Sequence, residues 1–174
     1  SSQLYSHQGG RCQEKIMFLL DSHCDTPSQI LRLRDLSIDN DHAHVDFPKL
    51  RKGGVDGAFF ALYVPASKEE EEAYVYSQRL LGAVRASIEA NSDKAAFAVS
   101  QDQAYINKQC GKFSVFLGLE NGSPIGHSID KLHEFYQDGV RYITLCHSRD
   151  NHICDSCASA TGRWGGLSPF GKEL

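Results

Sequence analysis

Four apolar runs, each followed by polar residues, constrain the fold of this chain more than any other feature. They lie at residues 16–24, 55–64, 113–120 and 140–147. Their hydrophobicity is nearly continuous rather than alternating, which is typical of strands buried on both faces of a parallel sheet. Because helical segments separate them, the sequence predicts an α/β fold.

The longest helix is predicted at residues 67–91. Ser67 and Glu70 have the spacing of a capping box, which starts helices. Apolar positions at helical spacing then predict the buried stripe, which consists of Ala73, Ser77, Leu80, Leu81, Val84 and Ile88. Shorter elements are predicted as a strand at 95–99 and as helices at 100–109 and 128–139.

Two segments show weaker patterns. Residues 28–50 predict a helix and then a loop that ends at Phe47-Pro48, and residues 49–54 predict a basic turn. The polar, glycine-rich residues 148–174 predict a loop with apolar anchors at Trp164, Leu167 and Phe170.

The apolar runs end in residues that suit metal chemistry. His23 and Asp25 are two positions apart, so an extended backbone points both to the same side. Glu120 and His147 end two later runs. A (β/α)8 barrel presents its active site in this way, at the C-terminal ends of its strands, but needs about 250 residues. With 174 residues, the chain is predicted to form half of such a barrel, as a single partial domain over 1–174.

Composition excludes some classes of partner. A net charge of −4 and a pI near 6.0 give no reason to expect nucleic acid or an anionic membrane. No run approaches the roughly 20 apolar residues of a membrane span. Residues 1–15 lack the apolar core of a signal peptide, which favours a cytoplasmic location and leaves a secreted or periplasmic one open. They could be a leader or the remnant of an engineered start.

Other residues that could bind metal are interpreted as structural. His42 and His44 lie in a polar loop without an apolar strand before it, so we expect them at the surface. Cys154 and Cys157 form a lone CxxC, and without a second pair we expect free thiols.

Several collinear stretches over residues 17–174 resemble the membrane (renal) dipeptidase family of zinc metallopeptidases, in the metal-dependent hydrolase superfamily. The stretches are 20–27, 46–60 with 63–65, 118–122, 135–147 followed by Asn151, and 166–171. The resemblance implies the N-terminal half of a (β/α)8 barrel. It also implies a zinc-dependent dipeptidase that cleaves the peptide bond of dipeptides with a metal-activated hydroxide.

The resemblance also implies roles for single residues. His23 and Asp25 would bind one zinc ion, and Glu120 would bridge two zinc ions. His147 would contact the substrate and the tetrahedral intermediate. The remaining ligands of the family would lie beyond Leu174, so the chain is expected to need the missing C-terminal half, or to pair with a second copy of itself.

Two alternatives stay open. The chain could be a truncated or diverged half-barrel that binds metal poorly and is not catalytic. It could also be another metal-dependent barrel hydrolase, a deaminase or a lactonase, although those usually carry His-x-His rather than His-x-Asp on the first strand. One departure from the family pattern is Asn121, which stands where a glycine is expected after the bridging glutamate.

Overall fold

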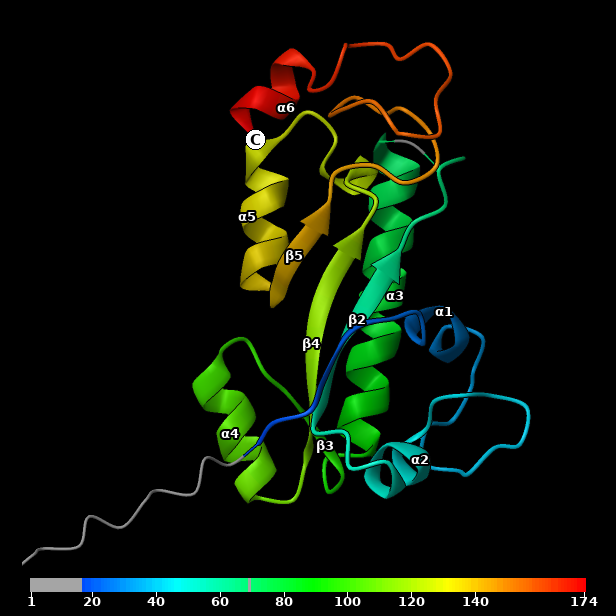
Figure 1. Ribbon diagram of the computed structural model, residues 1–174, viewed down its shortest axis with the longest axis vertical. Helices are drawn as coiled ribbons and strands as arrows, with labels where there is room; N and C mark the ends of the chain where they lie inside the picture. Colours follow the sequence, from blue (N-terminus) through cyan, green and yellow to red (C-terminus); the bar gives the residue numbers. More distant parts are fainter. Residues whose placement is uncertain (1–16, 69) are drawn as a thin grey trace, which may run out of the picture.

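The computed structural model describes residues 17–68 and 70–174, which fold into a parallel five-stranded sheet with helices around it (Figure 1). The predicted leader and the first residue of the 16–24 run lie outside the described residues. The strands are β1 (Leu20–Cys24), β2 (Gly57–Tyr63), β3 (Ala95–Phe97), β4 (Phe113–Glu120) and β5 (Val140–Thr144). The helices are α1 (Pro27–Ile30), α2 (Phe47–Lys52), α3 (Glu70–Ala90), α4 (Gln101–Gln109), α5 (Ile129–Gln137) and α6 (Pro169–Glu173), with a 3-10 turn η1 (Ser123–Ile125).

Strand β4 is the centre of the sheet. On one side it pairs with β2 along its length, from Gly57 opposite Ser114 to Tyr63 opposite Glu120. On the other side β3 pairs with its first part and β5 with its second part. Strand β1 pairs with β2. Because every pair is parallel, the strands all run in the same direction, toward the top of Figure 1. Within the described residues, β1, β3 and β5 each have one strand partner, so each carries an open edge.

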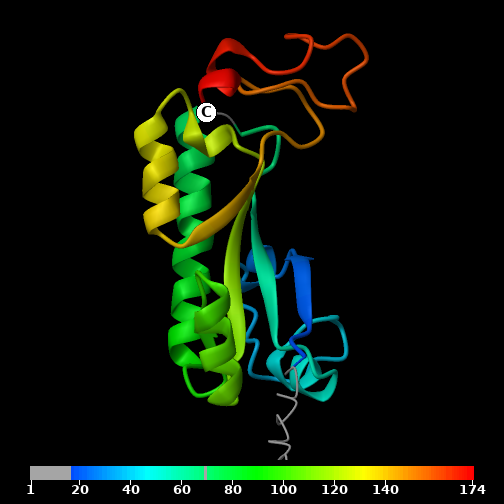
Figure 2. The ribbon, with the colours of Figure 1, turned by 60° about the vertical axis from the view of Figure 1, so that its left-hand side comes forward.

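The main core lies between the sheet and α3, which runs along one side of the sheet (Figure 2). Phe60 of β2 and Leu117 and Leu119 of β4 are almost fully buried in it. Helix α3 buries the predicted stripe and no other described residue. Each large side chain buried in this way contributes about 1.5–3 kcal/mol. This core fixes the sheet that carries the site.

The opposite face of the sheet carries aromatic side chains. Phe59 of β2 and Phe116 of β4 alternate with the core residues and stack here, with ring centroids 4.9 Å apart. Helix α4 covers the start of this face, where Phe116 packs with Ala104. The end of the same face, beyond the aromatic rings, holds the residues that the sequence predicts for the site.

The prediction for residues 28–54 is wrong in part. The structure has two short helices, and Phe47-Pro48 begins α2 instead of ending a loop. The Asp46 carboxylate caps α2 by accepting a hydrogen bond from the backbone N–H of Lys49 at 2.9 Å. Proline suits the first turn because its missing N–H would have no helical partner there. The predicted basic turn is therefore mostly helical.

The C-terminal segment is also more ordered than predicted. Residues 169–173 form α6, which Ser168 caps. Leu167 is 42% exposed and is no anchor, whereas Ile153 and Cys154 are buried. Among the helices of the described residues, none has the length and apolar character that crossing a membrane requires.

Candidate metal centre

Strands β1, β4 and β5 end at one edge of the sheet, and each brings a predicted site residue there. His23 lies on β1, and Asp25 directly follows that strand. Glu120 is the last residue of β4. The predicted strand 140–147 ends early, at Thr144, so His147 lies in the loop after β5. Parallel pairing places these side chains together although they are far apart in the sequence.

His23, Asp25 and Glu120 surround one point. The Nε2 atom of His23 lies 3.4 Å from Oδ1 of Asp25 and 3.2 Å from Oε2 of Glu120. One ligand atom from each residue lies within 4.8 Å of the other two. The side chains thus converge as the sequence predicts, while the role of each stays a prediction.

This geometry fits a divalent cation. Two ligand atoms of one tetrahedral zinc ion, each about 2.0–2.2 Å from the metal, are roughly 3.3–3.6 Å apart. The spacing of His23 Nε2 from the two carboxylate oxygens is close to that value. One imidazole nitrogen and carboxylate oxygens are also donors that zinc accepts.

Glu120 supplies a second observation that fits a cation. Its side chain is 12% exposed, and its Oε2 atom is buried without a hydrogen-bond partner among the described residues. A buried acceptor without a partner is costly unless a proton or a cation satisfies it. Burial raises the pKa of this carboxyl group, Asp25 raises it further, and His23 and His147 oppose the shift. A metal ion here would favour the ionised form.

His147 lies beside this group without joining it. Its Nε2 atom is 3.4 Å from Oε1 of Glu120, the oxygen that does not face His23. Its ring also packs edge-on against Tyr63, with centroids 5.1 Å apart. Among the described residues, the group of converging ligand atoms contains His23, Asp25 and Glu120 only. His147 is therefore placed to act on something bound next to that group.

Asn121 adopts the backbone conformation of a glycine. Its φ is +76°, a region that asparagine tolerates better than most residues. Its N–H donates to Thr144 Oγ1 at 2.8 Å, and its side-chain amide donates to the Val64 carbonyl at 2.9 Å. Its own amide oxygen accepts from the Ser123 N–H at 3.2 Å. Asn121 thus links the ends of β2, β4 and β5 directly after Glu120.

Sequence reasoning missed a contact of His23. The Tyr142 hydroxyl on β5 lies 2.8 Å from its Nδ1 atom. The alternation of side chains along β5 was the available signal, because it places Tyr142 on the same face as Thr144. Nothing in the local sequence indicates that the ring reaches the first strand.

The other candidates stay apart from this site. His42 and His44 are exposed in the loop before α2, as predicted. Cys154 and Cys157 are free thiols, also as predicted. His152 packs against His127, with ring centroids 4.9 Å apart.

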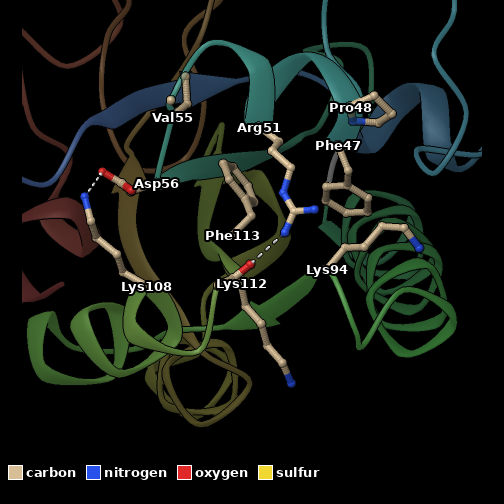
Figure 3. Close-up of a pocket in the computed structure, with 11 residues that line it drawn as sticks. Phe47, Pro48, Arg51, Val55, Asp56, Lys94, Lys108, Lys112 and Phe113 are labelled. Carbon is tan, nitrogen blue, oxygen red and sulfur yellow. Dashed lines mark hydrogen bonds and ion pairs between the residues drawn. The ribbon is translucent and has the colours of Figure 1, made fainter.

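A cavity of about 450 Å³ lies at the opposite end of the sheet, where β2 and β4 begin (Figure 3). Arg51, Lys94 and Lys112 lie around it, and Lys108 pairs with Asp56 at 2.8 Å. In Figure 3 the ammonium groups of Lys94 and Lys112 point away from each other. This basic cavity contains none of the predicted site residues.

Comparisons with known proteins give the family and the fold. The model of the membrane dipeptidase family, peptidase family M19, matches residues 11–174. Dipeptidase ataJ of Aspergillus terreus (strain NIH 2624 / FGSC A1156) is 31% identical over 156 residues, covering 79% of this chain and 37% of that protein. Dipeptidase verJ of Clonostachys rogersoniana is 28% identical over 176 residues, covering 90% of this chain and 44% of that protein.

Solved structures of metallopeptidases show the same fold. Dipeptidase AC, a metallopeptidase of family M19, superimposes with a TM-score of 0.77 at 22% identity, covering 91% of this chain and 52% of that one. A metallopeptidase from Rhodobacter sphaeroides, liganded with a phosphinate mimic of the dipeptide L-Ala-D-Ala, superimposes with a TM-score of 0.76 at 20% identity. The match covers 91% of this chain and 54% of that one. These likenesses confirm the predicted fold, half of a (β/α)8 barrel. The chain spans about half the length of the solved structures and less of the curated relatives.

Proposed function

Because the chain belongs to the membrane dipeptidase family, peptidase family M19, we propose that it supplies metal ligands and a substrate-contacting histidine to a zinc-dependent dipeptidase. The observation that carries this proposal is the convergence of His23, Asp25 and Glu120 around one point, where Oε2 of Glu120 is buried without a hydrogen bond from the described residues. The family is one of metallopeptidases, which supports a metal at this point.

His23, Asp25 and Glu120 would hold the first zinc ion. The other oxygen of Glu120 faces His147, away from His23, and this supports the idea that the carboxylate bridges to a second ion. A carboxylate has two oxygens and can span two cations. Further ligands of the second ion would come from the part of the family fold that this chain does not cover.

Zinc would supply a water molecule with a pKa near neutrality and would polarise the peptide carbonyl. The protein residues have separate tasks. Glu120 holds its negative charge in a poorly hydrated place, where it acts strongly on neighbouring cations. His147 would donate a hydrogen bond from its imidazole to the oxyanion that develops on the substrate.

The proposed substrate is a dipeptide with a free carboxylate. The curated relatives are named dipeptidases, and the Rhodobacter sphaeroides structure holds a dipeptide mimic. The side chain of His147 is 40% exposed, so a ligand can reach it.

Metal analysis and a dipeptidase assay test the proposal, on the chain together with any continuation that its gene encodes past Leu174. We expect bound zinc, hydrolysis that a chelator abolishes, and recovery on adding zinc. Asp25→Asn should lower both zinc content and hydrolysis, because an amide is a weaker ligand than a carboxylate. Asp41→Asn, a matched change in an exposed loop, should alter neither.

Two results would overturn the proposal. If Asp25→Asn bound as much zinc as the natural protein, Asp25 would not be a ligand and the metal would not bind at the proposed position. Tight zinc binding without hydrolysis of any dipeptide would favour the non-catalytic alternative.

A further inference from the structure

Tyr142 connects two strands with open edges, β5 and β1, across the face of the sheet that carries Phe59. It lies on β5, whereas its hydroxyl contacts Nδ1 of His23 on β1 at 2.8 Å. The two rings are nearly parallel, with an interplanar angle of 22° and centroids 6.2 Å apart. Strands β2 and β4 lie between these edges, so the contact depends on the ring crossing over them.

Gly118 of β4 makes room for this crossing. A Cβ atom at this position would lie 2.1 Å from Cζ of Tyr142 and 2.4 Å from Cε2. Phe59 supports the ring from β2, with centroids 5.1 Å apart. Phe116 in turn stacks on Phe59. Tyr142 therefore lies directly on the β4 backbone, and packing rather than its hydroxyl sets where the ring is.

This contact divides the two nitrogens of His23 between two tasks. A neutral imidazole has one N–H and one lone pair. If Nδ1 donates its hydrogen to the Tyr142 oxygen, the lone pair is on Nε2. That atom faces Asp25 and Glu120. Hydrogen bonding at the other ring nitrogen is the usual way in which proteins set the tautomer and orientation of a metal-binding histidine.

We propose that Tyr142 is a positioning residue for His23, which it holds with Nδ1 protonated and Nε2 directed at the candidate metal position, and that Gly118 provides the space it needs. The inference rests on the proposed metal site and adds to it a residue outside the ligand set. The tyrosine hydroxyl is the acting group, so a variant that keeps the ring and removes the hydroxyl isolates its contribution.

Tyr142→Phe is that variant. It keeps the packing on Gly118 and Phe59 and removes only the hydrogen bond to His23. Tyr136→Phe is the matched control, because Tyr136 is 62% exposed on α5 and stacks with Arg141 through its ring. In the full chain, we expect the zinc dissociation constant, measured by chelator competition, to rise about 10–100-fold in Tyr142→Phe. It should not change in Tyr136→Phe.

A second measurement needs no metal. Nitrogen NMR of the metal-free protein reports which ring nitrogen of His23 is protonated. We expect the same distribution of the proton between the two ring nitrogens of His23 in the natural protein and in Tyr136→Phe. We expect a different distribution in Tyr142→Phe, because that variant lacks the hydrogen bond at Nδ1.

These readouts separate failure of the inference from failure of the proposed function. Unchanged zinc affinity and an unchanged tautomer in Tyr142→Phe would refute the positioning role and leave the metal site standing. If the natural protein bound no zinc at His23, the proposed function would fail. The tautomer result would then still decide whether Tyr142 orients the imidazole.

Discussion

The carboxylate of Glu120 and the imidazole of His147 face each other with Oε1 and Nε2 3.4 Å apart, on the side of Glu120 turned away from His23. A carboxylate has two oxygens, so Glu120 could serve one cation beside His23 and a second cation on the side where His147 would act on the substrate. The predictions about the site follow from this division.

Glu120→Gln should largely abolish hydrolysis and reduce the zinc content. The change removes one negative charge from a place where cations are expected to gather, while it keeps the shape of the side chain. Elemental analysis and turnover measurements check this, with Glu89→Gln on the exposed face of α3 as the matched control. Natural turnover with full zinc content in Glu120→Gln would contradict the bridging role.

His147→Ala should lower turnover while zinc content stays nearly the same. One oxyanion donor contributes about 10²–10³-fold to turnover. His133→Ala, at an exposed position of α5, is the control for removing an imidazole. Loss of a stoichiometric zinc ion from His147→Ala would instead identify His147 as a ligand.

Gly118→Ala should destabilise the protein, because the added methyl group overlaps the Tyr142 ring. Overpacking of this kind costs about 1–3 kcal/mol. Adding Tyr142→Ala should relieve part of the cost, so that the two changes are not additive in urea unfolding. Strict additivity would show that the ring does not rest on Gly118.

Asp46 should make stability depend on pH. Burial by itself would raise the pKa of this carboxyl group, but hydrogen bonds from Lys49 and Asn40 lower it below its ordinary value. A lowered folded-state pKa means that the stabilisation is present above the unfolded pKa and is lost as pH falls through the folded one. The free energy of unfolding should therefore fall with acid in the natural protein, below the ordinary pKa of an aspartate.

Asp46→Asn isolates this contribution. Asparagine is also a good helix cap, so the variant keeps the α2 cap and loses the charge. We expect it to be less stable than the natural protein at neutral pH, with a difference that shrinks as the pH falls. Equal slopes of stability against pH in the two proteins would refute the assignment to Asp46.

The 174 residues alone should self-associate or melt without cooperativity. Strands β1 and β5 have open edges, and the neighbouring Leu19 and Leu145 are 49% and 39% exposed. Unpaired edges invite pairing with another chain. Burial of each such side chain by a partner would contribute about 1.5–3 kcal/mol. Light scattering and circular dichroism check this, and a monomer with a cooperative melt would contradict it.

Several features could be predicted because they depend on local order in the sequence. Continuous apolar runs located β2 and β4, and helical spacing identified the buried stripe of α3. The placement of His23, Asp25 and Glu120 at strand ends was enough to predict their convergence, because the strands that carry them run parallel to one another. Segments with weak patterns were harder to predict, as α2 and α6 show. In these segments, helix caps decided the local structure although the composition indicated a turn or a loop.

The sequence by itself therefore determined the half-barrel fold and which side chains gather at its edge. Only the tertiary structure decided how they are oriented. Tyr142 and His23 are 119 positions apart, and their contact requires the space above Gly118 on a third strand. The role of Asn121 likewise depends on β2, β4 and β5 ending side by side. Such contacts join residues whose proximity is set by the packing of the whole sheet, and no local pattern encodes them.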